Sequence, residues 1–299
     1  MARIARQNKC DLNRIEFSPN WEESMAATLL ISGKGQRSSP YVLVLLVAGT
    51  LLGTLSAEAK GWSSTGGGSG ALCFDKPEKA ALIEFSRTKN GILTDSQLSS
   101  AVSLESLDLH EAGTLEKEGI TAFAGRQLQQ SKAGLADETV LYAAAMNRLR
   151  LIIPEAASRI QQIYAAIVAQ KWEARSSLND ILDRSDRARL AENCIFVQIL
   201  ARHSSPGDQM IPRTNADLPT GIIEVDLRLW NRLDVLNKAA LLFHESLYIL
   251  AASHAEHRDS LRVRAMTRKI FSLDLESLSR DKLAREQLNS ELRLMLGLK

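Results

Sequence analysis

The chain has 299 residues, of which 45% are hydrophobic and 24% charged, a composition typical of a folded domain rather than of a disordered tail. Residues 1–59 hold six of its basic and five of its acidic side chains, so the rest of the chain balances 31 basic against 30 acidic groups, a net charge of +1. That balance excludes a general electrostatic attraction to nucleic acids or anionic membranes. Aromatic residues, at 5%, leave few rings for stacking on bases or sugars.

Residues 41–55 form an uncharged, mostly apolar run that is typical of the hydrophobic region of a secretion signal. As a helix this run rises about 22 Å, which is short of the roughly 30 Å hydrocarbon core that an anchor must span. Ala57 and Ala59 follow with the small residues that signal peptidase requires. We therefore expect residues 1–59 to be a leader whose removal leaves no membrane span, and the mature protein to be periplasmic or secreted. An uncleaved membrane anchor is the alternative.

Met25 is the expected start of translation within this leader. From Met25 to Pro40 the only charged residues are Lys34 and Arg37, so this stretch carries a charge of +2 ahead of the apolar run. A short positive segment followed by an apolar one is the order that secretion signals have.

The cysteines predict one disulfide bond in the exported part of the chain. Cys10 lies in the leader, which leaves Cys73 and Cys194 as the pair. Oxidising compartments favour such pairing, and closing a loop of about 120 residues restricts the unfolded chain by about 4–5 kcal/mol. Two buried free thiols are the alternative.

The predicted elements indicate a mainly α-helical domain with a small β element, an α+β fold. Residues 60–70 include the run SSTGGGSG and predict a flexible linker, so the domain is expected to occupy residues 71–299. Short apolar or β-branched runs predict strands at 72–74, 194–200 and 222–227, with a long loop over 201–221. Apolar residues at helical spacing predict helices at 77–87, 96–118 with a break at Gly113, 138–153, from Pro154 onward, 235–252, 260–271 and 281–296.

The most suggestive motif is the pair His244-Glu245 within the predicted helix 235–252. In zinc hydrolases a second histidine one turn later completes the metal site, and the glutamate activates the bound water. Here the i+4 residue is Tyr248. A zinc site would need a chain reversal that returns His254 or His257 to His244, with an acidic ligand such as Glu245 or Glu256, and Glu245 would then be the catalytic base.

A structural role for His244 is the competing interpretation. An imidazole beside a buried helical stripe commonly donates to a backbone carbonyl or a carboxylate, and Glu245 would pair with an arginine. The available arginines lie in or just before the next predicted helix: Arg258, Arg262, Arg264 and Arg268. A second acidic and histidine-containing group, Asp108, His110 and Glu111, would join the site only if its segment faces the helix 235–252.

Four segments resemble, in order, a group of uncharacterised exported proteins of Gram-negative bacteria, best represented among predatory species. They are the Gly-rich run 66–70, the D-L-x-E-A block 108–112, the segment 225–230 leading to the H-E-x-x-Y helix 239–248, and an S-x-x-V-R-like stretch at 260–264. The resemblance implies export and a shared architecture but no catalytic residue. It also implies that Tyr248 is a partner of His244 rather than a lost metal ligand, and that a tyrosine is usual where this chain has His110.

The sequence thus favours an exported envelope protein with a non-catalytic structural or interaction domain. Its internal polar network is predicted to contain His244, Glu245, Tyr248, Arg264, Asp108 and Glu111. No cofactor is assured, and a protein partner in the cell envelope is the expected kind of ligand. The alternative is a zinc-dependent hydrolase, with Glu245 as its catalytic residue and metal ligands drawn from His244, His254 and His257.

Overall fold

A computed structural model was used to describe the fold. The chain divides into two units, Met1–Leu55 and Ser56–Lys299. The structure describes only part of the second unit, namely residues 68–90, 92–130, 138–176, 178, 190–203, 219, 221–253, 260–272 and 275–298. The predicted leader with Met25, the first part of the predicted linker, and both His254 and His257 lie outside these described residues.

The described residues form eleven helices and two three-stranded sheets, which confirms the predicted mainly helical fold with a small β element. One sheet has the order β2-β1-β4 and is antiparallel throughout, with β1 Ser69–Cys73, β2 Ser103–Ser106 and β4 Cys194–Gln198. The other has the order β3-β6-β5, with β3 Lys171–Arg175 parallel to β6 Ile222–Asp226 and β5 Leu200–His203 antiparallel to it.

Glycines join the two sheets by allowing close backbone approach. Only Ile199 separates β4 from β5, and the amides of Ile199 and Leu200 both donate to Gly68 O at 2.8 Å. Gly68 has φ +68°, and a Cβ there would lie 2.6 Å from Leu200 O. A Cβ on Gly70 would lie 2.7 Å from the Ile199 side chain. The predicted flexible linker is therefore wrong from residue 68 onward, because Gly68 and Gly70 are required by packing rather than by mobility.

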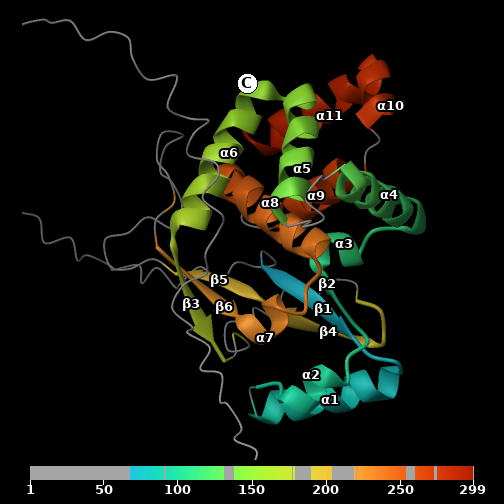
Figure 1. The fold of residues 1–299 in the computed structure, drawn as a ribbon, viewed down its shortest axis with the longest axis vertical. Helices are drawn as coiled ribbons and strands as arrows, with labels where there is room; N and C mark the ends of the chain where they lie inside the picture. Colours follow the sequence, from blue (N-terminus) through green and yellow to red (C-terminus); the bar gives the residue numbers. More distant parts are fainter. Residues whose placement is uncertain are drawn as a thin grey trace, which may run out of the picture. The chain divides into compact units, whose positions relative to one another are not determined.

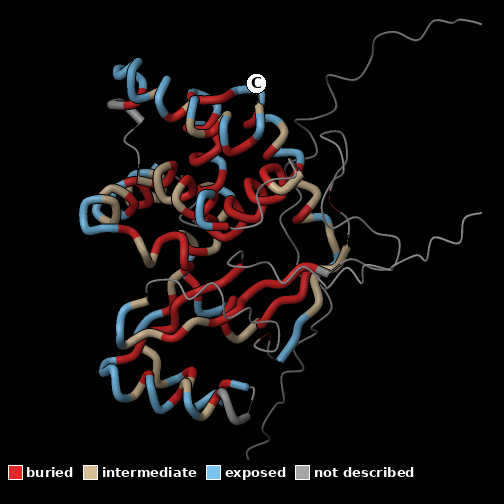
Figure 2. The backbone as a smooth tube through the Cα atoms, turned by 180° about the vertical axis from the view of Figure 1, so that it is seen from behind, coloured by how far each residue is buried: buried red, intermediate tan, exposed pale blue. Residues whose placement is uncertain are grey.

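Helix α8, Val235–Ala252, is the central helix of the domain and contacts α5 Glu138–Ile152, α6 Pro154–Ala169 and α9 Leu261–Ser272 (Figure 1). Fourteen of its eighteen residues are buried, so it is covered on nearly all sides instead of along the single stripe that the sequence predicted (Figure 2). Asp234 caps it, accepting from Asn237 N at 2.7 Å. This buried helix carries His244 and Glu245.

The remaining helices surround these elements. They are α1 Pro77–Asn90, α2 Asp95–Ser99, α3 Leu107–His110, α4 Thr114–Gln130, α7 Leu227–Trp230, α10 Leu275–Arg280 and α11 Lys282–Met295. Helices α1 and α2 lie on the side of the first sheet opposite to α5, α8 and α9 (Figure 1). Three isoleucines at helical spacing in α6, Ile160, Ile163 and Ile167, are all buried in the core.

The structure corrects the predicted helix 96–118. Residues Ser103–Ser106 form β2 and pair with β1, with Leu104 opposite Leu72, so the tract holds α2, a strand, α3 and the start of α4. The pairing partner lies about thirty residues away, and the hydrogen bonds it offers override the local helical spacing. The sequence also missed β3 and α10.

Candidate functional site

Asp108 and His244 form a buried hydrogen-bonded pair at the contact between α3 and α8. The Nδ1–H of His244 donates to Asp108 Oδ1 at 2.5 Å, and their side chains are 0% and 1% exposed. The side chain of Asn237, near the start of α8, accepts from Ser106 N at 2.7 Å and so ties the beginning of α3 to α8. The two segments therefore face each other, which the sequence left open.

The pair fixes the chemistry available to the imidazole. Because Asp108 occupies Nδ1, Nε2 carries the lone pair that would act as a base or a metal ligand. Neither His244 Nε2 nor Asp108 Oδ2 has a hydrogen-bond partner among the described residues. The ring of Tyr248 stacks near that of His244, with centroids 6.1 Å apart and an interplanar angle of 21°. Tyr248, one helical turn after His244, is therefore its neighbour on α8.

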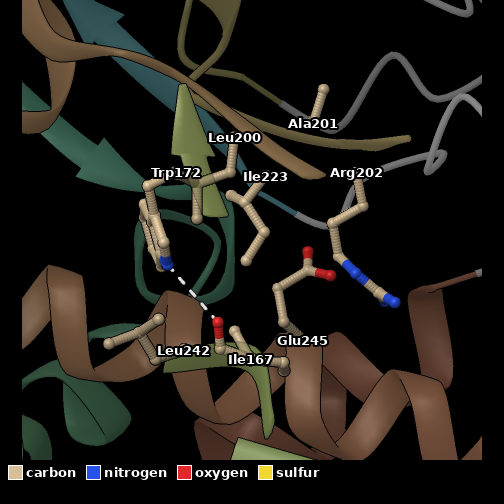
Figure 3. A pocket seen from close by; sticks show the side chains of 8 residues that line it. All are labelled: Ile167, Trp172, Leu200, Ala201, Arg202, Ile223, Leu242 and Glu245. Atoms are coloured by element: carbon tan, nitrogen blue, oxygen red, sulfur yellow. Dashed lines mark hydrogen bonds between the residues drawn. The ribbon is translucent and has the colours of Figure 1, made fainter. Parts of the chain in front are cut away.

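Glu245 points from α8 toward the second sheet, where Arg202 of β5 lies (Figure 3). Both side chains are buried, at 4% and 8% exposure. Burial raises the pKa of Glu245, while His244 and Arg202 lower it in part and Asp108 raises it further. Burial likewise lowers the pKa of Arg202, and the Glu245 charge counteracts this. The two groups thus compensate each other's loss of hydration.

A small cavity lies between Glu245 and the sheet (Figure 3). Its volume is about 10 Å³, room for about one water molecule. Small-molecule sites usually measure about 300–1,000 Å³. Its other walls are mostly apolar side chains, with the indole of Trp172 donating to Ile167 O at 3.3 Å. The described residues thus leave no room for a substrate at Glu245.

Glu111 belongs to a separate ion-pair cluster between α3 and α9. Arg264 donates from Nη1 to Glu111 Oε1 at 3.1 Å, and Arg268 donates from Nη1 to Glu111 Oε2 at 2.9 Å. Glu111 thus binds Arg264 and Arg268, whereas Glu245 faces Arg202. Arg258, another of the predicted partners of Glu245, lies outside the described residues. The predicted network divides into an α3–α8 part around His244 and an α3–α9 part around Glu111.

The structure contains the predicted disulfide between Cys73 and Cys194, whose Cα atoms lie 4.0 Å apart across β1 and β4. Within the part of the chain that the structure describes, the one group of three potential metal ligands that lie close together is Cys73, His110 and Cys194. Among the described residues, His244 does not belong to a group of three such ligands. The predicted zinc ligands His254 and His257, and Glu256, lie outside the described residues.

Two features were not predicted from the sequence: the position of Arg202 opposite Glu245, and the position of His110 beside the Cys73–Cys194 disulfide. Arg202 was assigned to a loop, although its spacing of two from Leu200 would have placed both on one face of a strand. Comparison with protein-family models, curated proteins and solved structures finds no match to this chain. Among the described helices, none has the length and apolar character that crossing a bilayer requires.

Proposed function

We propose that this chain is an exported cell-envelope protein whose folded domain is non-catalytic and serves a structural or interaction role. The closed environment of the Asp108–His244 pair carries this proposal, since both side chains are buried and directly hydrogen-bonded. A hydrolytic site needs space about 3 Å from its nucleophile for the reacting atom of a substrate. The cavity of about 10 Å³ beside Glu245 does not supply it.

Export is supported by two independent features. The apolar run 41–55 with Ala57 and Ala59 has the order of a secretion signal. The Cys73–Cys194 disulfide suits the oxidising conditions of the periplasm or the cell exterior. The balanced charge after residue 59 favours a protein partner in the envelope over a nucleic acid.

A reporter that is active only outside the cytoplasm tests the export part of the proposal. The full chain is fused at its C-terminus to alkaline phosphatase and expressed in a Gram-negative host, beside a matched Leu46→Arg variant. The charge in the variant interrupts the apolar run. We expect the wild-type fusion to be at least about ten times more active than the variant at equal protein level. Equal, low activity of both fusions contradicts export.

One observation favours a metal-dependent hydrolase as the second candidate. A carboxylate that holds one imidazole nitrogen while the other stays available is the usual arrangement around metal-binding histidines. Asp108 holds His244 in this way, and Glu245 is the neighbouring residue that would activate a water.

Zinc titration of the oxidised full-length chain, followed by thermal unfolding, separates the two candidates. Zinc at 100 times its dissociation constant would stabilise a real site by about 2.7 kcal/mol. The non-catalytic proposal expects the same small shift for the wild type and for His244→Ala. A stabilisation seen in the wild type and lost in the variant supports the hydrolase.

A further inference from the structure

Three metal-ligating side chains from three different elements converge at the edge of the first sheet, away from His244. Cys73 ends β1 and Cys194 begins β4, and the two residues are directly opposite in the antiparallel register. His110 is the last residue of α3. The two sulfur atoms and a ring nitrogen of His110 all lie within 4.8 Å of one another.

These distances are close to those that a zinc ion requires. Zinc binds sulfur at about 2.3 Å and imidazole nitrogen at about 2.0–2.1 Å in tetrahedral geometry, so its ligand atoms lie roughly 3.4–3.8 Å apart. The nitrogen–sulfur separations, which are at most 4.8 Å, therefore have to shrink by no more than about 1 Å. The two sulfur atoms, joined here in the disulfide, have to separate, which only reduction allows.

The carboxylate of Glu105 orients the His110 ring for metal binding. Its Nδ1 lies 3.1 Å from Glu105 Oε2, and Lys117 Nζ lies 3.2 Å from the same oxygen. This leaves Nε2 as the nitrogen for a metal, in the carboxylate–histidine arrangement that fixes the ring and strengthens the ligand. The side chain of His110 is 10% exposed, so the group is shielded and still touches solvent.

An apolar shell covers the sulfur atoms. Ala71, Cys73 and Leu107 form a small buried cluster, against which Leu190, Cys194 and Phe196 pack. Such a shell lowers the local dielectric and strengthens the attraction between a cation and two thiolates. Two soft sulfur ligands and one imidazole select zinc over magnesium or calcium, which prefer oxygen ligands.

We propose that reduction of the Cys73–Cys194 disulfide creates a zinc site made of the two thiolates and the His110 imidazole, and that oxidation releases the metal. The fourth position of the zinc remains open for water or a ligand from a partner. The disulfide is thus the metal-free form of a redox-controlled site: it joins β1 to β4 when oxidised, and the zinc would add α3 to that link when the cysteines are reduced. This inference does not depend on any role of His244.

The redox step balances with a dithiol as the reductant. The dithiol supplies two electrons and two protons, the S–S bond breaks, two cysteine thiols form, and the dithiol becomes a cyclic disulfide. Zinc binding then displaces the two thiol protons into solvent, and the thiolates become ligands. An oxidant that itself carries a disulfide reverses the sequence, accepts the two electrons and releases the zinc.

The test uses the full-length chain carrying Cys10→Ser, so that Cys73 and Cys194 are its only cysteines. The protein is reduced anaerobically with dithiothreitol, freed of reductant and titrated with zinc against a chromophoric chelator. Cobalt substitution then reports sulfur ligation through its thiolate charge-transfer absorption, and circular dichroism reports the fold. The oxidised protein is carried through the same steps.

We expect the reduced protein to bind about one zinc, to show the charge-transfer band with cobalt, and to keep its helical signal. The oxidised protein should bind at least 100-fold more weakly. His110→Ala leaves the disulfide intact and should weaken zinc binding by the reduced chain at least tenfold, and Glu105→Gln by about tenfold. The matched control, His244→Ala, should bind as the parent does.

Three results overturn the proposal. The first is equal zinc binding by the oxidised and reduced chains. The second is undiminished binding by reduced His110→Ala. The third is a reduced chain that binds no zinc, or binds it only with loss of the helical signal, which would make the disulfide purely structural.

Discussion

Replacement of His244 by alanine is the perturbation whose effect the structure defines best. The imidazole is fully buried and donates to a carboxylate that is itself buried. The variant loses the packing of the ring and leaves Asp108 in the core without its donor. Breaking a buried pair by removing one partner costs about 3–5 kcal/mol of the free energy of unfolding. For a domain of this size that corresponds to a fall in melting temperature of roughly 6–20 °C.

Urea unfolding followed by circular dichroism measures this loss in a double-mutant cycle. The cycle compares the oxidised wild type with His244→Ala, Asp108→Ala and the double variant. Each single variant leaves the other partner buried without its hydrogen bond, whereas the double variant removes both. The losses of unfolding free energy in the two single variants should therefore add up to about 1.5–3 kcal/mol more than the loss in the double variant. The matched control is His110→Ala, which breaks a similar but longer His–Glu105 contact of 3.1 Å at a more exposed position.

The control variant His110→Ala should lower the free energy of unfolding by about 1 kcal/mol, the ordinary net value of a hydrogen bond. A coupling below about 0.5 kcal/mol between His244 and Asp108 would refute the reasoning, because the pair would then contribute nothing beyond its separate packing terms. So would a loss in His244→Ala no larger than that in His110→Ala.

Three further predictions follow from particular contacts. The hydrogen bond from His110, with Lys117, lowers the pKa of Glu105 from 4.5 to about 2, so its stabilisation is present above pH 4.5 and lost as the pH falls toward 2. With 32% of the side chain exposed, Glu105→Gln should remove about 1 kcal/mol of the free energy of unfolding at pH 6 and only a small part of that at pH 2, measured by urea unfolding. Burial raises the pKa of Glu245, so the folded protein holds its proton at a pH where the unfolded chain has lost it. The free energy of unfolding of the wild type should therefore fall as the pH rises above 4.5, by up to about 1.4 kcal/mol per pH unit. Glu245→Gln should flatten a plot of this free energy against pH. Gly68→Ala should cost about 2–4 kcal/mol because of its positive φ and the close contact with Leu200 O, whereas Gly113→Ala, with open space around its Cβ, should stay within about 0.5 kcal/mol in the same assay.

Features with a local cause were predictable from the sequence. The start of α8 after Asp234 follows from a side chain that caps its own helix, and the start of α6 at Pro154 from a residue that lacks the amide hydrogen. The strand Ser103–Ser106 was not predictable in this way. It holds a single large apolar residue, Leu104, and its extended form depends on hydrogen bonds from β1.

The candidate site shows the same division. His244 and Glu245 were identifiable because a His-Glu pair on a helix is the beginning of a known zinc-hydrolase motif. Their partners are set by tertiary structure, since Asp108 lies 136 positions from His244 and Arg202 comes from a separate strand. A charged residue can be found in a sequence pattern, but the opposite charge that allows its burial is fixed only when the elements pack.

The metal content of the purified, oxidised full-length chain, measured by mass spectrometry beside that of His244→Ala, tests the central claim most directly. Both proteins are prepared without chelators, and their melting temperatures are recorded on the same samples. A structural Asp108–His244 pair predicts far less than one zinc per chain in both proteins and a melting temperature that is clearly lower in the variant. Near-stoichiometric zinc in the wild type, absent from a variant that melts at the same temperature, would contradict the claim and make His244 a metal ligand.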